Sequence, residues 1–147
     1  MPEIAKNKRA YFDYNIIETY EAGIELLGLE VKSARNGGLN LAGSYVIIRG
    51  NEAWLLNADL RPYQPMNTPS DYDSKRTRRL LLNNKEIKEL ISRSKESNLT
   101  IVPLRATIKG RFIKLEIGLA KSKKKTDKRE AIKKRESDRD IKKRFKV

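Results

Sequence analysis

Alternating apolar and polar positions mark residues 14–26 as one long strand. Apolar side chains fall on even positions and mostly polar ones on odd positions, which is the spacing of a strand with one buried face. Glu18 breaks the apolar side, and Gly23 interrupts the middle, where a glycine permits a bulge or a sharp bend. A long, bent strand of this kind is typical of a small closed barrel.

Two hairpins are predicted further along the chain. Each consists of two short runs rich in apolar residues on either side of a glycine-containing dipeptide, and in the second hairpin the apolar residues alternate with polar ones. Pro103 has no N–H to donate, so we expect an unpaired stretch in its strand. The predicted strands are residues 45–48 and 52–56, joined by Gly50-Asn51, and residues 100–108 and 111–117, joined by Lys109-Gly110.

Two helices are also predicted. Asn83 followed by Glu86 matches a capping box, and the apolar residues that come next have helical spacing, so we expect a helix over residues 84–97. A shorter helix over residues 29–36 ends at Gly37-Gly38, since glycine accepts the left-handed conformation that terminates helices.

These elements together predict an α+β protein that is mainly β. The expected architecture is a small, antiparallel, oligonucleotide-binding-like barrel with two or three helices and a disordered, basic C-terminal tail. Residues 61–76 contain three prolines and no periodicity, so they form a surface loop. We place the barrel domain at residues 1–119 and the tail at residues 120–147, which hold too few apolar groups to offset the entropy of folding.

The charge of the chain points to a polyanionic partner. Lys and Arg number 33 against 19 Asp and Glu, a net charge of +14, and the tail alone carries +9. Histidine and cysteine are absent, which excludes imidazole and thiolate catalysis and the usual zinc sites. No apolar run is long enough to span a bilayer and the N-terminus has no apolar signal core, so we expect a cytoplasmic protein that does not contact membranes. We also expect a monomer.

Enzymatic chemistry has little support in the sequence. The carboxylate pairs Asp71 with Asp73 and Asp138 with Asp140 each lack a nearby third ligand for a catalytic metal ion. Neither of the common glycine motifs that cradle phosphates is present. We therefore expect no metal, no cofactor and no catalytic residue.

Three basic clusters suggest contacts with phosphates. They lie at residues 6–9, at residues 75–79 and from residue 121 onward, and each can release counterions from a nucleic acid. Neighbouring aromatic residues can stack on unpaired bases, although packing into the core is the alternative for each of them. The residues alone thus predict an RNA-binding barrel with a basic arm. A ribosomal protein or RNA chaperone fits that description equally well, and an RNA-processing enzyme is a third alternative.

The tail has the sequence features of a helix but no apolar stripe. Asp127 and Glu130 can cap a helix start, and acidic residues precede basic ones at i,i+4 three times. Ile132 and Ile141 are nine residues apart, so at ~100° per residue they lie about 180° apart around a helix. We therefore expect the tail to fold only against a polyanion.

Several short strings, in order along the chain, resemble the family of bacterial SsrA-binding proteins, also called small protein B. These are Asn7-Lys8-Arg9-Ala10, Tyr20-Glu21-Ala22-Gly23, Glu30-Val31-Lys32-Ser33 with Arg35 and Gly37, Asn40-Leu41 with Ser44-Tyr45-Val46, Arg78-Arg79-Leu80-Leu81-Leu82, Gly118-Leu119-Ala120-Lys121 and Asp127-Lys128-Arg129. The chain departs from many relatives at Thr126, where they carry an aromatic residue, and at Ser122, where they carry glycine.

The resemblance implies that the protein binds transfer-messenger RNA and helps to rescue stalled ribosomes by trans-translation. The barrel would grip the transfer-RNA-like part of that RNA. The tail would become helical on the ribosome, in the decoding region and empty message channel of the small subunit.

The resemblance also implies roles for particular residues. The expected RNA-binding set is Asn7, Lys8, Arg9, Glu21, Lys32, Arg35, Arg78, Arg79, Leu81, Lys121, Lys123 and Lys124. The expected decoding-region set in the tail is Asp127, Lys128, Arg129, Ile132, Lys133, Lys134 and Arg135.

Overall fold

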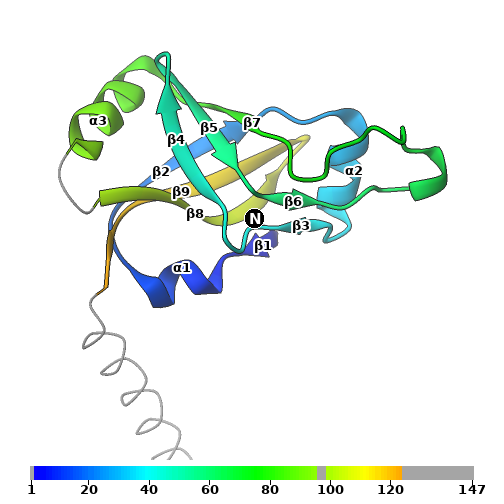
Figure 1. The fold of residues 1–147 in the computed structure, drawn as a ribbon, viewed down its shortest axis with the longest axis horizontal. Coiled ribbons are helices and arrows are strands. Elements are labelled where there is room, and N and C mark those ends of the chain that lie inside the picture. Colours follow the sequence, from blue (N-terminus) through cyan, green and yellow to red (C-terminus); the bar gives the residue numbers. More distant parts are fainter. Residues whose placement is uncertain (1, 96–98, 124–147) are drawn as a thin grey trace, which may run out of the picture.

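Strands dominate the described part of the chain, and three α-helices lie around them there (Figure 1). The computed structural model describes residues 2–95 and 99–123. The elements are β1 (Glu3–Lys6), α1 (Lys8–Asp13), β2 (Tyr14–Ile24), α2 (Gly28–Arg35), β3 (Leu39–Asn40), β4 (Tyr45–Arg49), β5 (Glu52–Leu56), β6 (Asp59–Leu60), a 3-10 turn η1 (Pro65–Asn67), β7 (Arg78–Leu81), α3 (Asn84–Ser94), β8 (Leu99–Lys109) and β9 (Phe112–Ser122).

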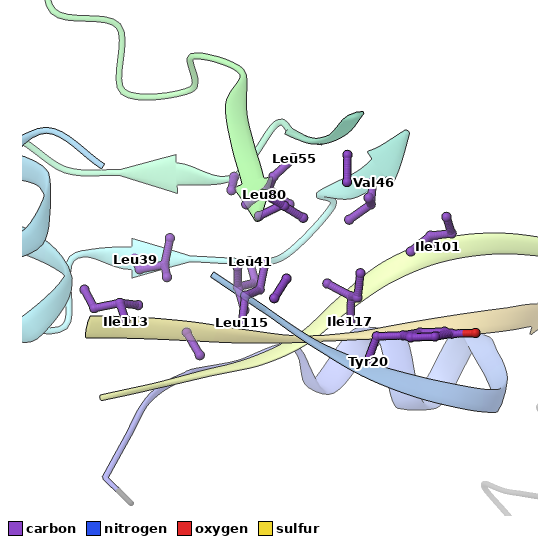
Figure 2. Packing of buried hydrophobic residues seen from close by; sticks show 14 of the residues in the cluster. Tyr20, Leu39, Leu41, Val46, Leu55, Leu80, Ile101, Ile113, Leu115 and Ile117 are labelled. Carbon is purple, nitrogen blue, oxygen red and sulfur yellow. The ribbon is translucent and has the colours of Figure 1, made fainter. Parts of the chain in front are cut away.

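Six of the strands form a closed antiparallel ring. Their order is β8-β4-β5-β7-β2-β9, and the ring closes because β9 also pairs with β8, while β1 adds to the other side of β8. A separate two-stranded sheet joins β3 to β6. Apolar side chains from the strands fill the interior, as Figure 2 shows for Tyr20, Leu55, Leu115 and Ile117. The mainly β, antiparallel α+β class predicted from the sequence is confirmed.

The long alternating strand is β2, which pairs with β9 over most of its length. In this register the inward side chains Tyr20 and Ala22 lie opposite Ile117 and Leu115. The register shift falls between Ile16 and Glu18, so of the two features expected at Gly23, a bulge or a sharp bend, the bulge lies elsewhere in the strand.

Gly23 instead marks the point where β2 changes partner. It pairs with Lys114 of β9 and with Leu81 of β7. A Cβ at Gly23 would come within 3.3 Å of the Cβ of Leu81, which is tighter than most such contacts. Glycine is therefore suited to this position because two backbones approach each other closely there.

Both predicted hairpins are present. Gly50 and Asn51 have φ angles of 60° and 58°, the left-handed conformation that a two-residue turn of type I′ requires at both central positions. In the second hairpin Lys109 pairs with Phe112, so the turn is Gly110-Arg111, one residue later than predicted. Strands β8 and β9 are also longer than the apolar runs from which they were predicted.

The strand that contains Pro103 leaves its regular register next to this residue, as expected for an unpaired stretch, although Pro103 itself lies opposite Ile117. Its register with β9 shifts between Pro103 and Arg105. Asn7 satisfies the carbonyls of this stretch, because its main-chain N–H donates to Leu104 O over 2.8 Å and its side-chain amide donates to Pro103 O over 2.9 Å.

The two predicted helices are α2 and α3. Asn83 and Glu86 form both hydrogen bonds of the capping box at the start of α3. The helix ends at Ser94, three residues before the predicted end, and residues 96–98 lie outside the described part. The six-residue α1 was not predicted.

The last strand extends beyond the predicted domain boundary. β9 continues to Ser122, and Ala120, which the sequence placed in the tail, is fully buried and pairs with Ile16 and Thr100. The described fold therefore passes residue 119, and the predicted tail beyond residue 123 lies outside the described residues. In the part of the chain that is described, no helix is long and apolar enough to cross a membrane.

Candidate nucleic-acid interface

Pairing of β2 with β9 brings two distant basic segments together. Asn15 lies opposite Lys121, and the main-chain N–H of Lys123 donates to Asp13 O over 2.9 Å. The Lys123 ammonium reaches back to Tyr11 O at 3.3 Å. The end of β9 is thereby held against α1, the helix that contains Lys8 and Arg9. We call Lys8, Arg9, Lys121 and Lys123 the α1–β9 patch.

The cations of the α1–β9 patch are accessible. Lys8, Arg9 and Lys121 are exposed and Lys123 is half-buried. Arg9 donates to Asp13 over 3.3 Å, but its side chain remains 77% exposed, so the ion pair leaves most of the guanidinium in contact with solvent. Because exposed ion pairs are weak, this one leaves Arg9 free to exchange Asp13 for a phosphate.

Asn7 supports this patch from inside. It is 4% exposed, and its side-chain oxygen accepts the N–H of Ala10 at the first turn of α1. With the bonds to Pro103 and Leu104 described above, it joins α1 to β8. Asn7 also lines a hollow of about 270 Å³ together with Arg9 and Tyr14. Its position favours holding α1 in place over direct contact with a ligand.

Glu21 and Leu81 lie on the outer face of the ring, at the other end of β2. Glu21 is exposed and pairs in register with Glu116, whose carboxylate accepts from Arg105 over 2.9 Å. Among residues 2–95 and 99–123, no side chain pairs with the Glu21 carboxylate. Leu81 is 50% exposed beside Gly23. An unpaired carboxylate is thus open to hydrogen-bond donors of a ligand.

A groove of about 410 Å³ lies beside Leu81. Phe112 is 70% exposed on this groove, and Arg111 and Lys114 give it positive charge. We call it the Leu81 groove, and its lining residues are Gly23, Ile24, Glu25, Leu26, Val31, Leu81, Arg111, Phe112, Ile113 and Lys114.

The predicted contacts on α2 are exposed and lie far from α1, because α1 precedes β2 and α2 follows it (Figure 1). The Lys32 ammonium lies 5.9 Å from the centre of the Tyr63 ring, and Arg35 donates to Gly110 O at 3.5 Å. Lys32 and Arg35 therefore form a second basic region, separate from the α1–β9 patch.

Arg78 is not on the surface, which corrects its predicted role. Its side chain is completely buried and donates to Glu30 over 2.6 Å and to Ala58 O over 2.9 Å. No donor of Arg78 faces a ligand, so we remove it from the RNA-binding set. Its neighbour Arg79 points the other way, is 43% exposed and pairs with Glu52 at 2.9 Å. The alternation along β7 separates these two arginines.

The buried charge of Glu30 organises this part of the fold. Arg76 and Arg78 both pair with its carboxylate, which also accepts the main-chain N–H of Leu27 at 2.9 Å. Burial by itself would raise the pKa of Glu30, but the hydrogen bonds from Arg76, Leu27 and Arg78 outweigh it and lower the pKa. Burial and the charge of Glu30 raise the pKa of Tyr72, whose hydroxyl lies 3.1 Å from that carboxylate.

Sequence reasoning did not identify Glu30 as the partner of Arg78. The two residues are 48 positions apart, and only the folded chain brings them together. Tyr72 belongs to the same network, because its hydroxyl contacts Glu30 and Leu60 O. Tyr11, by contrast, is 37% exposed and lies 5.6 Å from the Lys6 ammonium.

The remaining predicted residues cannot be placed in this site. Lys124 and the decoding-region set, residues 127–135, lie outside the described residues. Within residues 2–95 and 99–123, no group of three Asp, Glu, His or Cys side chains is arranged to hold a metal ion.

Comparison with known proteins identifies the family. Residues 4–147 match the family described as SmpB protein. The SsrA-binding protein of Mesoplasma florum is 52% identical over 92% of this chain and 91% of its own length, and that of Thermosipho africanus is 51% identical over 96% and 95%. A chain solved in work described as "tmRNA-SmpB: a journey to the center of the bacterial ribosome" has a TM-score of 0.68 and 38% identity, and covers 86% of this chain and 92% of its own. This chain therefore belongs to the SmpB protein family.

Proposed function

We propose that this protein binds the transfer-RNA-like domain of transfer-messenger RNA and delivers it to stalled ribosomes in the cytoplasm. The observation that carries the proposal is the α1–β9 patch, in which β2–β9 pairing joins two basic segments about 110 positions apart. Phosphate binding is the chemistry such a patch favours. The relatives are named SsrA-binding proteins, and the description of the solved neighbour names tmRNA-SmpB and the bacterial ribosome.

The body offers two surfaces for this RNA. The α1–β9 patch supplies cations for the backbone, and Glu21 with Leu81 supplies a hydrogen-bond acceptor and an apolar contact at the other end of β2. Phosphate contacts position an RNA, whereas acceptors and apolar groups can select particular bases or riboses. Having one surface for phosphates and another for bases or riboses supports recognition of one particular folded RNA. The protein acts by binding and does not need a catalytic group of its own.

The tail is proposed to act on the ribosome. It follows Lys123, which the structure holds against α1, so residues 124–147 start from the α1–β9 patch. Asp127, Lys128 and Arg129 would contact the decoding region, and the basic residues after them would follow the message channel.

Two measurements test the proposal. The RNA that copurifies with the protein at moderate salt should be a single transfer-messenger RNA, whereas bulk ribosomal RNA would indicate a ribosomal protein or RNA chaperone. Replacing Asp127, Lys128 and Arg129 together by Ala should leave the affinity for the transfer-RNA-like domain nearly unchanged and abolish tagging in a reconstituted assay. Full tagging by this variant would contradict the proposed role of the tail.

A charge-matched pair of variants tests the patch itself. We expect that replacing Lys8 and Arg9 with Gln weakens RNA binding. It should also reduce the slope of log K against the logarithm of the salt concentration by about two, because about one unit of slope is lost for each phosphate contact. The control replaces Lys85 and Lys88, which are exposed on α3, with Gln. It makes the same change in net charge and should have much smaller effects on RNA binding and its salt dependence.

A further inference from the structure

The outer face of the β4–β5 hairpin carries a groove that none of the predicted RNA-binding residues lines. It has a volume of about 480 Å³ and is lined by Ile47, Arg49, Trp54, Leu56 and Thr77; we call it the Trp54 groove. Ile47 and Trp54 are directly paired across the hairpin and half-buried on its outer face. We propose that the Trp54 groove binds an unpaired nucleotide of RNA, whose base stacks on the Trp54 indole.

The Trp54 groove is continuous with the proposed RNA-binding face. A middle hollow of about 330 Å³ shares Trp54 and Thr77 with the Trp54 groove, and shares Glu25 and Leu26 with the Leu81 groove. The three hollows therefore form one trough that crosses β5, β7 and β2, which are neighbours in the ring (Figure 1). An RNA held beside Leu81 can extend along it.

Charge complementarity favours RNA as the occupant. Arg49 lines the Trp54 groove, and Arg76 and Arg79 line the middle hollow. Among the described residues, Glu25 is the single carboxylate that lines the Trp54 groove or the middle hollow. Arg79 lies beside Trp54 in the β5–β7 register and pairs with Glu52 at 2.9 Å. Because that ion pair is exposed and therefore weak, the Arg79 guanidinium can exchange Glu52 for the phosphate of a base on the indole. Arg49 is exposed at the other side of the groove.

The geometry of Trp54 favours stacking over base-specific hydrogen bonding. Its indole N–H already donates to Arg49 O at 3.4 Å, which leaves the ring surface as the group that a ligand meets. Aromatic surfaces accept any base, because every base has a π-face. Paired bases in an A-form helix do not expose theirs, so the occupant must be unpaired. This inference rests on the proposed function, and it extends the RNA-binding face by one site.

The chain provides its own probe, because Trp54 is its only tryptophan. Titrating the full-length protein with a short, single-stranded oligoadenylate at moderate salt should quench the Trp54 emission to a saturating level. Inorganic polyphosphate, which has the charge without the bases, and a blunt RNA duplex should leave it nearly unchanged. Quenching by polyphosphate equal to that by oligoadenylate would overturn the proposal.

Variants complete the test. Trp54→Leu should weaken oligoadenylate binding by about tenfold in a filter assay, within the range for loss of one base–aromatic stack, and Trp54→Phe should retain most of the affinity. Arg49→Gln, a substitution at an exposed position, should also weaken binding, whereas Lys88→Gln on α3 should not. Equal affinity of all four variants for oligoadenylate would exclude the Trp54 groove.

Binding of the transfer-RNA-like domain to the unsubstituted protein separates this inference from the proposed function. If that domain binds but oligoadenylate leaves Trp54 emission unchanged, the groove is not an RNA site and the proposed function stands. If that domain does not bind, the proposed function fails. If the transfer-RNA-like domain displaces oligoadenylate, the Trp54 groove binds an unpaired nucleotide of transfer-messenger RNA. If the protein binds the domain and oligoadenylate together, the groove binds unpaired nucleotides of a second RNA.

Discussion

Arg78 and Glu30 form an ion pair with both side chains completely buried, in which Arg78 donates to the Glu30 carboxylate through Nε at 3.0 Å and Nη2 at 2.6 Å. Arg78 lies on β7 and Glu30 on α2, so this pair fastens the helix to the ring. Arg78 Nη1 donates to Ala58 O at 2.9 Å, which extends the attachment to the segment before β6. The pair is thus a structural joint of the fold.

We expect Glu30→Gln to destabilise the protein by about 3–5 kcal/mol, because it leaves the buried guanidinium of Arg78 without its counter-charge. Urea unfolding should show the loss as a lower midpoint. Glu52→Gln, which removes the exposed partner of Arg79, is the matched control and should cost at most about 1 kcal/mol. Equal losses in the two variants would show that the buried pair contributes no more than a surface pair.

Stability should also decrease in acid through Glu30. Although burial acts to raise its pKa, the hydrogen bonds from Arg76, Leu27 and Arg78 lower it below the ordinary value of 4.5. Stabilisation by a carboxylate with a lowered pKa is complete above the pKa of the unfolded state and is lost as the pH falls through that of the folded state. The stability difference between the unsubstituted protein and Arg76→Gln should therefore be constant near neutral pH and shrink below about pH 4.5. A difference that grows in acid would contradict this assignment.

The folded body should end near residue 123. A chain that stops after Lys123 retains the whole of β9 and the bond from Lys123 N–H to Asp13 O, so its thermal midpoint should match that of the full chain. A chain that stops after Leu119 loses Ala120, which is fully buried between Ile16 and Thr100, and should melt at a lower temperature. Equal melting of the two truncated chains would place the boundary at residue 119, as the sequence pattern did.

Glu21→Ala should weaken binding of the transfer-RNA-like domain with little effect on folding. Glu21 is exposed, and its carboxylate has no side-chain partner in the described part of the chain, so its removal breaks no described contact. Loss of a charged hydrogen bond to the RNA costs about 1.5–3 kcal/mol, or roughly tenfold or more in affinity. Filter binding and a thermal melt on the same variant measure the two effects. Asp71→Ala, an exposed carboxylate in the surface loop, is the control, and equal RNA affinity of the two variants would leave Glu21 without a binding role.

Local patterns in the sequence were sufficient for the main elements. The period-two alternation of β2, the turn at Gly50-Asn51 and the capping box of Asn83 and Glu86 each depend on residues close together in the chain. Their physical basis is equally local: side-chain spacing, left-handed backbone conformations and capping hydrogen bonds. These features could therefore be predicted before the fold was known.

Tertiary structure alone decided which of the charged residues are available to a ligand. Adjacent arginines, Arg78 and Arg79, look equivalent in the sequence, yet one is fully buried on Glu30 and the other is exposed. The α1–β9 patch likewise exists because β2 pairs with β9 and brings Lys121 and Lys123 to α1. Burial and proximity of this kind depend on contacts between residues far apart in the chain, which no local pattern records. The sequence by itself thus determined the long strand β2, the two hairpins, the capped helix α3 and the overall charge of this protein, while the closure of the ring decided which of the charged side chains are exposed and placed Trp54 in a groove.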